Sequence, residues 1–170
     1  MIKVVLTGSE STGKTTLARE LAARFDAPVS TEFVREFAAR KGSIDFADHG
    51  AIARGQMAAE DEAIARAGPL VILDTDLVST VVYCEHYFGR SPEWIVKEAR
   101  ARAGDLYLLM LPDIPWLPDG VRDRGDRREE MHALFRDKLR DMGLRYVEID
   151  GDGFARLTQA IAAIEATATP

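Results

Sequence analysis

The segment from Gly8 to Thr15 has the residue types and the spacing of a phosphate-binding loop. It reads GSESTGKT, which matches the pattern G-x-x-x-x-G-K-[ST], and it directly follows an apolar run at residues 4–6. The glycines let the backbone turn so that successive N–H groups face one concavity, and the helix that follows adds its N-terminal partial positive charge. The segment therefore predicts a site for a nucleoside triphosphate, formed by Gly8, Ser9, Glu10, Ser11, Thr12, Gly13, Lys14, Thr15 and Thr16.

Two carboxylates and one hydroxyl beside this loop are candidates to bind Mg²⁺ or to orient the hydroxyl group of a molecule that accepts a phosphoryl group. Lys14 can place its ammonium between the β- and γ-phosphates, and Thr15 can give its hydroxyl to Mg²⁺. Asp74 ends an apolar strand, where a buried carboxylate needs a partner, and it is the second predicted Mg²⁺ residue. Asp76 has two interpretations: it orients an acceptor hydroxyl, or it caps the helix that begins at Leu77.

Glu32 follows the second predicted strand, as Asp74 and Asp76 follow the third. In a kinase the acceptor hydroxyl needs a carboxylate that orients it and takes its proton, so Glu32 and Asp76 are both candidates. Arg35, one helical turn later, can hold the Glu32 carboxylate or a phosphate. The alternative is that Glu32 and Arg35 form an ordinary exposed ion pair.

Arginines gather after the fourth predicted strand, at Arg122, Arg124, Arg127 and Arg128. We expect Arg122 or Arg124 to close over the transferring phosphoryl group, because a guanidinium can hold two oxygens at once. Aspartates alternate with these arginines, so a solvated charged loop is the alternative.

Strands and helices alternate along the chain, which predicts one domain over residues 1–170 with a five-stranded parallel sheet between two layers of helices. Apolar runs predict strands at residues 3–7, 28–31, 70–73, 106–111 and 146–149. Helices are expected at residues 14–25, 32–40, 45–67, 77–88, 126–142 and 154–165, and one more begins after Ser91. Asp45 and Ser91 are the expected caps of the helices that they precede, and residues 112–125 are expected to form a loop. Ligands bind at the carboxyl ends of parallel strands, so the candidate residues should surround one cleft.

Composition limits the classes of protein and partner. A net charge of −6 disfavours a nucleic-acid partner. Cys84 is the only cysteine, which excludes a disulfide within the chain and fits a reducing cytoplasm. No apolar run has the length of a membrane span, and the first strand begins too close to Met1 to leave room for a signal peptide. The oligomeric state is not indicated.

Several segments together resemble the ribosylnicotinamide kinase domain of NadR-type NAD-salvage proteins. They are Gly8-x-Glu10-Ser11-x-Gly13-Lys14, Glu32-x-x-Arg35-Glu36-Phe37, Leu73-Asp74-Thr75-Asp76, Cys84 with Tyr87-Phe88-Gly89, and Pro115-Trp116-x-x-Asp119-Gly120-x-Arg122. The resemblance implies a P-loop NTPase fold of the nucleoside and adenylate kinase type. It also implies transfer of the γ-phosphoryl group of ATP, with Mg²⁺, to the 5′-hydroxyl of nicotinamide riboside.

The chain departs from this family where two aromatic rings sandwich the nicotinamide. Thr31 stands at one of these positions, and residues 59–61 hold no aromatic at the other. Phe33, Tyr83 and Trp116 are candidates to replace the lost stacking. Two alternatives therefore stay open: a P-loop kinase of a different small molecule, and a nucleotide-dependent regulatory ATPase.

Overall fold

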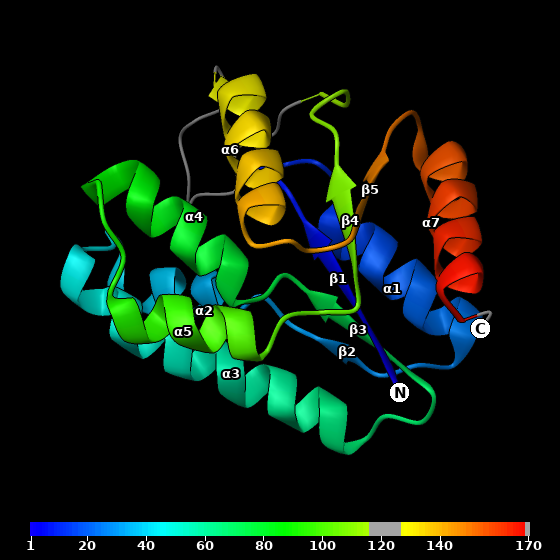
Figure 1. Ribbon diagram of the computed structural model, residues 1–170, viewed down its shortest axis with the longest axis horizontal. Coiled ribbons are helices and arrows are strands. Elements are labelled where there is room, and N and C mark those ends of the chain that lie inside the picture. The colour runs from blue at the N-terminus through cyan, green and yellow to red at the C-terminus, as the bar shows by residue number, and fades with distance from the viewer. Residues whose placement is uncertain (116–126, 169–170) are drawn as a thin grey trace.

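The computed structural model describes residues 1–115 and 127–168. Its centre is one parallel sheet with the strand order β2-β3-β1-β4-β5, as Figure 1 shows. The strands are β1 (Ile2–Thr7), β2 (Val29–Ser30), β3 (Leu70–Asp74), β4 (Leu106–Met110) and β5 (Tyr146–Ile149). The predicted five-stranded parallel sheet of a P-loop fold is confirmed.

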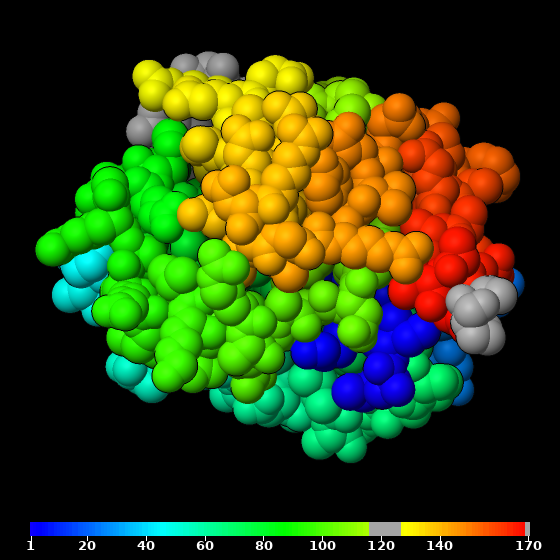
Figure 2. Space-filling model, viewed as in Figure 1, coloured from blue at the N-terminus to red at the C-terminus, as the bar shows by residue number. Residues whose placement is uncertain are grey.

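Helices connect the strands and cover both faces of the sheet. They are α1 (Lys14–Phe25), α2 (Phe33–Lys41), the 3₁₀ turn η1 (Phe46–Asp48), α3 (His49–Ala65), α4 (Leu77–Phe88), α5 (Glu93–Ala101), α6 (Arg128–Asp141) and α7 (Gly153–Ala168). Among these described helices, none combines the length and apolar character needed to span a bilayer. Figure 2 shows α5 in green and α6 in yellow on the near face of the molecule, with blue atoms of the N-terminal end of the chain at the surface below them.

The core has two halves because successive strand residues point to opposite faces of the sheet. Val4 and Leu6 of β1 pack with side chains of α1 and α7 on one face. Val5, between them, packs with side chains of α3, α4, α5 and α6 on the other. All three are fully buried. Burial on both faces explains why β1, β3 and β4 read as continuous apolar runs in the sequence.

Most element boundaries agree with the predictions, and the differences lie at caps and edges. β2 is shorter than expected because it lies at the sheet edge and pairs with β3 over two residues only. Asp45 precedes the turn η1 rather than a long helix, since its N–H donates to the Asp48 carboxylate at 2.7 Å and α3 begins after that turn. Pro92, not the expected Ser91, occupies the cap position of α5. Arg127 precedes α6, and the expected cap Asp126 lies outside the described residues.

Candidate active site

The phosphate-binding loop joins the end of β1 to the start of α1 at the carboxyl edge of the sheet. Gly8 and Gly13 have positive φ angles of 130° and 81°. A Cβ atom on Gly8 would lie 2.9 Å from the backbone oxygen of Met110, so the loop approaches β4 too closely for another residue. Ser11 also has a positive φ, of 53°, a conformation that a serine keeps only where its surroundings hold it. The tight backbone turns expected at the two glycines are present.

Lys14 is the first residue of α1, and its side chain folds back into the loop. Its ammonium donates hydrogen bonds to the backbone oxygens of Gly8 at 3.1 Å and Ser9 at 2.6 Å. The residue is 4% exposed, so its charge stands inside the loop and not at the surface. Glu10 is fully buried, and the Tyr83 hydroxyl donates to its carboxylate at 3.3 Å. The loop thus has a buried positive charge at the point where phosphates are expected.

Thr15 and Asp74 form a hydroxyl–carboxylate pair beside the loop. Thr15 Oγ1 donates to Asp74 Oδ2 at 2.7 Å, although the two residues come from α1 and β3. Asp74 Oδ1 is buried and accepts no hydrogen bond from the described residues. Burial raises the pKa of Asp74, and the hydrogen bond from Thr15 opposes this. A buried carboxylate oxygen without a donor is costly, so this pair fits a hard cation such as Mg²⁺.

Glu32 lines a small cavity together with this pair. The cavity has a volume of about 320 Å³, and Thr15, Thr31, Glu32 and Asp74 are among the residues that line it. Glu32 is 5% exposed, and its carboxylate accepts a hydrogen bond from Arg35 Nε at 2.6 Å. The Glu32 side chain is buried, so the pair is not the ordinary exposed ion pair of the alternative interpretation.

Asp76 has the contacts of a helix cap. Its Oδ1 accepts from the Val78 N–H at 3.0 Å, and its Oδ2 accepts from the Tyr107 hydroxyl at 2.6 Å. Burial raises the pKa of Asp76 to about 6, and the Tyr107 hydrogen bond opposes that shift. Asp76 does not line the cavity that Glu32, Thr15 and Asp74 share. Of the two carboxylates predicted to orient an acceptor, Glu32 alone has access to that cavity.

Tyr83 and Phe33, two of the residues expected to stack on the ligand, do not line this cavity. Among residues 1–115 and 127–168, no aromatic side chain lines the cavity, where Thr31 stands. Tyr83 packs edge-on against Phe135, and Phe33 packs beside Phe37. Trp116 lies outside the described residues. In the middle of the expected second stacking position, Glu60 is buried and pairs with Arg102 at 3.2 Å.

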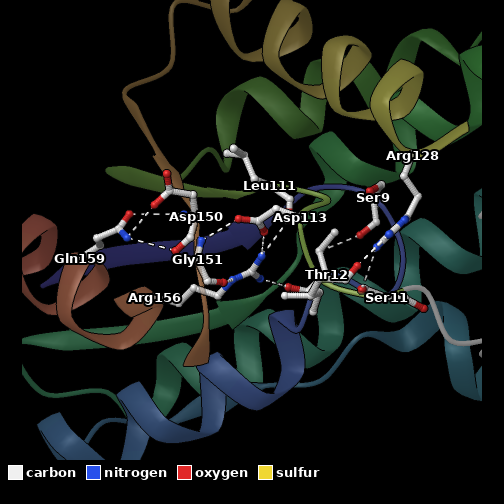
Figure 3. Close-up of polar contacts among 11 residues, drawn as sticks. Ser9, Ser11, Thr12, Leu111, Asp113, Arg128, Asp150, Gly151, Arg156 and Gln159 are labelled. Carbon is white, nitrogen blue, oxygen red and sulfur yellow. Dashed lines mark hydrogen bonds and ion pairs between the residues drawn. The ribbon is translucent and has the colours of Figure 1, made fainter. Parts of the chain in front are cut away.

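Arginines reach the loop from two other elements. Arg122 and Arg124 lie in the segment 116–126, outside the described residues. Arg128, at the start of α6, donates to the backbone oxygens of Ser11 at 3.4 Å and Ile114 at 2.7 Å. Arg156 of α7 is 4% exposed and donates to the Thr12 backbone oxygen (Figure 3). Sequence reasoning missed Arg156, although it is the one basic residue of a helix that is otherwise largely apolar.

This loop on a five-stranded parallel sheet defines a P-loop nucleotide-binding domain with a kinase-like α/β architecture. The chain belongs to the AAA domain family (AAA_28), whose sequence profile matches residues 3–156. It is 27% identical over 158 residues to the trifunctional NAD biosynthesis/regulator protein NadR of Escherichia coli strain K12, and 28% identical over 169 residues to NadR of Salmonella typhimurium. These alignments cover 89% and 93% of this chain but only 38% and 41% of those proteins.

Comparison with solved structures also shows similarity to NadR. A NadR structure in complex with NR has a TM-score of 0.80 at 28% identity, and the match covers 99% of this chain and 50% of that one. A NadR complex with NAD and AMP-PNP has a TM-score of 0.79, 27% identity and the same two coverages. A thymidylate kinase from Ehrlichia chaffeensis shares the fold, with a TM-score of 0.68 and 15% sequence identity. That match covers 96% of this chain and 98% of the kinase chain. The expected homology to NadR is confirmed, over about half of the solved NadR chains.

Proposed function

We propose that this domain is an ATP- and Mg²⁺-dependent kinase of a small nucleoside-like acceptor, with nicotinamide riboside as the first candidate. The observation that carries the proposal is the cavity of about 320 Å³ that Glu32 shares with Thr15 and Asp74. An acceptor bound there lies between a candidate base and the residues expected to hold Mg²⁺. The NadR complexes with NR and with AMP-PNP support the choice of acceptor and of nucleotide.

The proposed roles follow from these contacts. Thr15 and Asp74 would hold Mg²⁺, and the ion would neutralise charge on the phosphates. Lys14 leaves the backbone oxygens of the loop and binds the β- and γ-phosphates. Glu32 accepts the proton of the acceptor hydroxyl. The oxygen of that hydroxyl forms a bond to the γ-phosphorus, and the bond from the γ-phosphorus to the β–γ bridging oxygen breaks, with ADP as the leaving group. Arg122 or Arg124 stabilises the charge on the transferring group.

A second candidate function is a kinase of another small alcohol. The observation that favours it is the cavity lining, which holds Thr31 and no aromatic side chain among the described residues. Nicotinamide binding by ring stacking requires an aromatic partner, whereas a polyol or another nucleoside can be bound through hydrogen bonds.

Thermal unfolding with ligands tests the proposal. The protein is measured with Mg²⁺ and AMP-PNP, and then with nicotinamide riboside added. A ligand at about a hundred times its Kd stabilises the folded state by roughly 2.7 kcal/mol, so each bound ligand raises the midpoint. A second shift on adding the riboside, followed by its phosphorylation by ATP, is the expected result. A shift with AMP-PNP alone, together with turnover of another alcohol from an acceptor panel, would select the second candidate.

A further inference from the structure

Arg156 lies at the junction of three loops at the carboxyl edge of the sheet (Figure 3). Its Nε donates to the Gly151 backbone oxygen at 2.7 Å, and its Nη2 donates to the Leu111 backbone oxygen at 2.9 Å. The remaining contacts are an ion pair with Asp113 and the hydrogen bond from Nη1 to the Thr12 backbone oxygen. One guanidinium therefore links the phosphate-binding loop to the segments that follow β4 and β5.

The contact with Thr12 fixes a peptide of the loop that the expected ligand uses. In a trans peptide the C=O and the following N–H point in opposite directions. Holding the Thr12 carbonyl toward Arg156 therefore directs the Gly13 N–H away from Arg156. In a phosphate-binding loop the N–H groups face the phosphates, so an N–H turned away from the guanidinium is available to them.

This loop needs such support because its backbone is strained. Ser11 has a positive φ of 53° without being a glycine. Arg128 holds the Ser11 carbonyl at 3.4 Å, and Arg156 holds the next carbonyl along the chain. Strained backbone of this kind persists where the surroundings hold it in place.

Position 156 requires an arginine because the side chain there donates to several hydrogen-bond acceptors. Three backbone oxygens and the Asp113 carboxylate surround the side chain, and a guanidinium offers five N–H donors in a fixed plane. A lysine ammonium has three donors on one atom and cannot reach the three loops at once. Asp113 extends the same connection, because its Oδ2 accepts from the Gly151 N–H at 2.6 Å.

We propose that Arg156 is a positioning residue for nucleotide binding, which holds the Thr12–Gly13 peptide in its anion-binding orientation. The inference rests on the nucleotide-binding part of the proposed function and is independent of the acceptor. It also assigns the α7 helix, far from the loop in sequence, a direct part in the affinity for the triphosphate.

The test compares Arg156→Met, Arg156→Lys and the control Gln159→Ala by calorimetric titration with Mg²⁺-ADP. Gln159 lies on the same helix, and its side-chain hydrogen bonds within the described part of the chain are all with Asp150, at 2.8 Å to the carboxylate and 3.0 Å to the backbone oxygen. We expect the Kd for Mg²⁺-ADP to rise about tenfold or more in Arg156→Met, to rise less in Arg156→Lys, and to stay unchanged in Gln159→Ala.

A steady-state measurement separates positioning from general loosening of the fold. In Arg156→Lys, the KM for ATP should rise while the KM for the acceptor stays the same. Wild-type affinity in the folded Arg156→Met protein would overturn the inference, and so would an equal loss in Gln159→Ala. If Arg156→Met does not fold, wild-type Kd and KM values in Arg156→Lys overturn it in the same way. Absence of any phosphorylated acceptor, with nucleotide binding intact, would count against the proposed kinase activity and not against this role of Arg156.

Discussion

The Thr15 hydroxyl donates a hydrogen bond of 2.7 Å to the Asp74 carboxylate, and so connects the first turn of α1 to the end of β3. The strands β1 and β3 are neighbours in the sheet, and Leu6 of β1 pairs with Asp74, the last residue of β3. This register brings the hydroxyl that follows the phosphate-binding loop next to a carboxylate 59 residues away. The second oxygen of Asp74 is buried and has no donor among residues 1–115 and 127–168, which makes this pair the candidate Mg²⁺ site.

The first prediction concerns this pair. Asp74→Asn keeps an oxygen for the Thr15 hydroxyl but removes the negative charge that a Mg²⁺ ion needs. We expect kcat to fall by about a hundredfold and the Mg²⁺ concentration for half-maximal activity to rise. Titration of activity with MgCl₂ checks this. An unchanged Mg²⁺ dependence would show that Asp74 is not a ligand of the ion.

Lys14→Ala should remove most of the affinity for the triphosphate. The ammonium is buried in the loop, where a charge-assisted contact with phosphate is strong, so the Kd for ATP should rise by about a hundredfold or more. The circular dichroism spectrum should keep its helical intensity. Lys97→Ala, on the exposed side of α5, removes the same charge elsewhere and should bind ATP as the wild type does. Full ATP turnover by Lys14→Ala would refute the role of the loop.

The sheet and the turn of the candidate phosphate-binding loop could be predicted because their signals are local. Lys14 and Thr15 belong to one eight-residue motif, and Asp74 ends an apolar strand. Asp76 could not be assigned, because a carboxylate after a strand serves equally as a helix cap or as a ligand group until its partners Val78 and Tyr107 are known. The contact of Arg156 with Thr12 spans 144 residues, and a lone arginine in a helix gives no sign of its partner.

Glu32→Gln should lower kcat without changing the affinity for nucleotide. The amide cannot accept the proton of the acceptor hydroxyl, and general bases contribute about 10²- to 10⁴-fold to rate. Glu36→Gln is the matched control, because Glu36 lines the same cavity but is exposed and pairs with Arg40 at 3.4 Å. Rapid-mix measurement of product formation with bound ATP gives kcat for both. A fully active Glu32→Gln protein and an inactive but folded Asp76→Asn protein would assign the base to Asp76 instead.

Alanine substitutions at two glycines of α3 should have opposite effects on the stability of the protein. A Cβ on Gly50 would have its nearest contacts at 3.6 Å, to the end of the Arg54 side chain. Gly50→Ala should therefore stabilise the protein by up to about 1 kcal/mol, the usual gain in a helix. A Cβ on Gly55 would overlap the ring of Phe33, the residue after Glu32. Gly55→Ala should cost about 1–3 kcal/mol and lower kcat as α2 shifts.

Urea unfolding of the two variants measures these effects. Equal midpoints for Gly50→Ala and Gly55→Ala would mean that the Phe33 ring moves aside without cost, and that α3 does not fix the start of α2. The hydrogen bond from the Phe33 backbone N–H to the Gln56 side-chain Oε1, at 3.1 Å, connects these helices and is left in place by both substitutions.

Stability should fall as the pH rises through the titration of Glu60. Burial, followed by the charge of Asp76, raises the pKa of Glu60 from 4.5 to about 7, and the Arg102 guanidinium opposes this. Between these pH values the folded protein keeps a proton that the unfolded chain has lost, so the free energy of unfolding decreases with pH. The decrease attributable to Glu60 is on the order of 3 kcal/mol and is complete about one pH unit above the folded pKa of about 7. Glu60→Gln should flatten the curve of urea midpoint against pH.

The control for this prediction is Glu62→Gln, on the exposed side of the same helix, where Glu62 lies 3.8 Å from Arg66. This variant should follow the wild-type curve. Part of the slope should persist in Glu60→Gln, because Asp76 is buried with a raised pKa of about 6 and acts in the same direction. A Glu60→Gln curve identical to that of the wild type would mean that Glu60 is ionised in the folded protein at pH 5, as an ordinary carboxylate paired with Arg102.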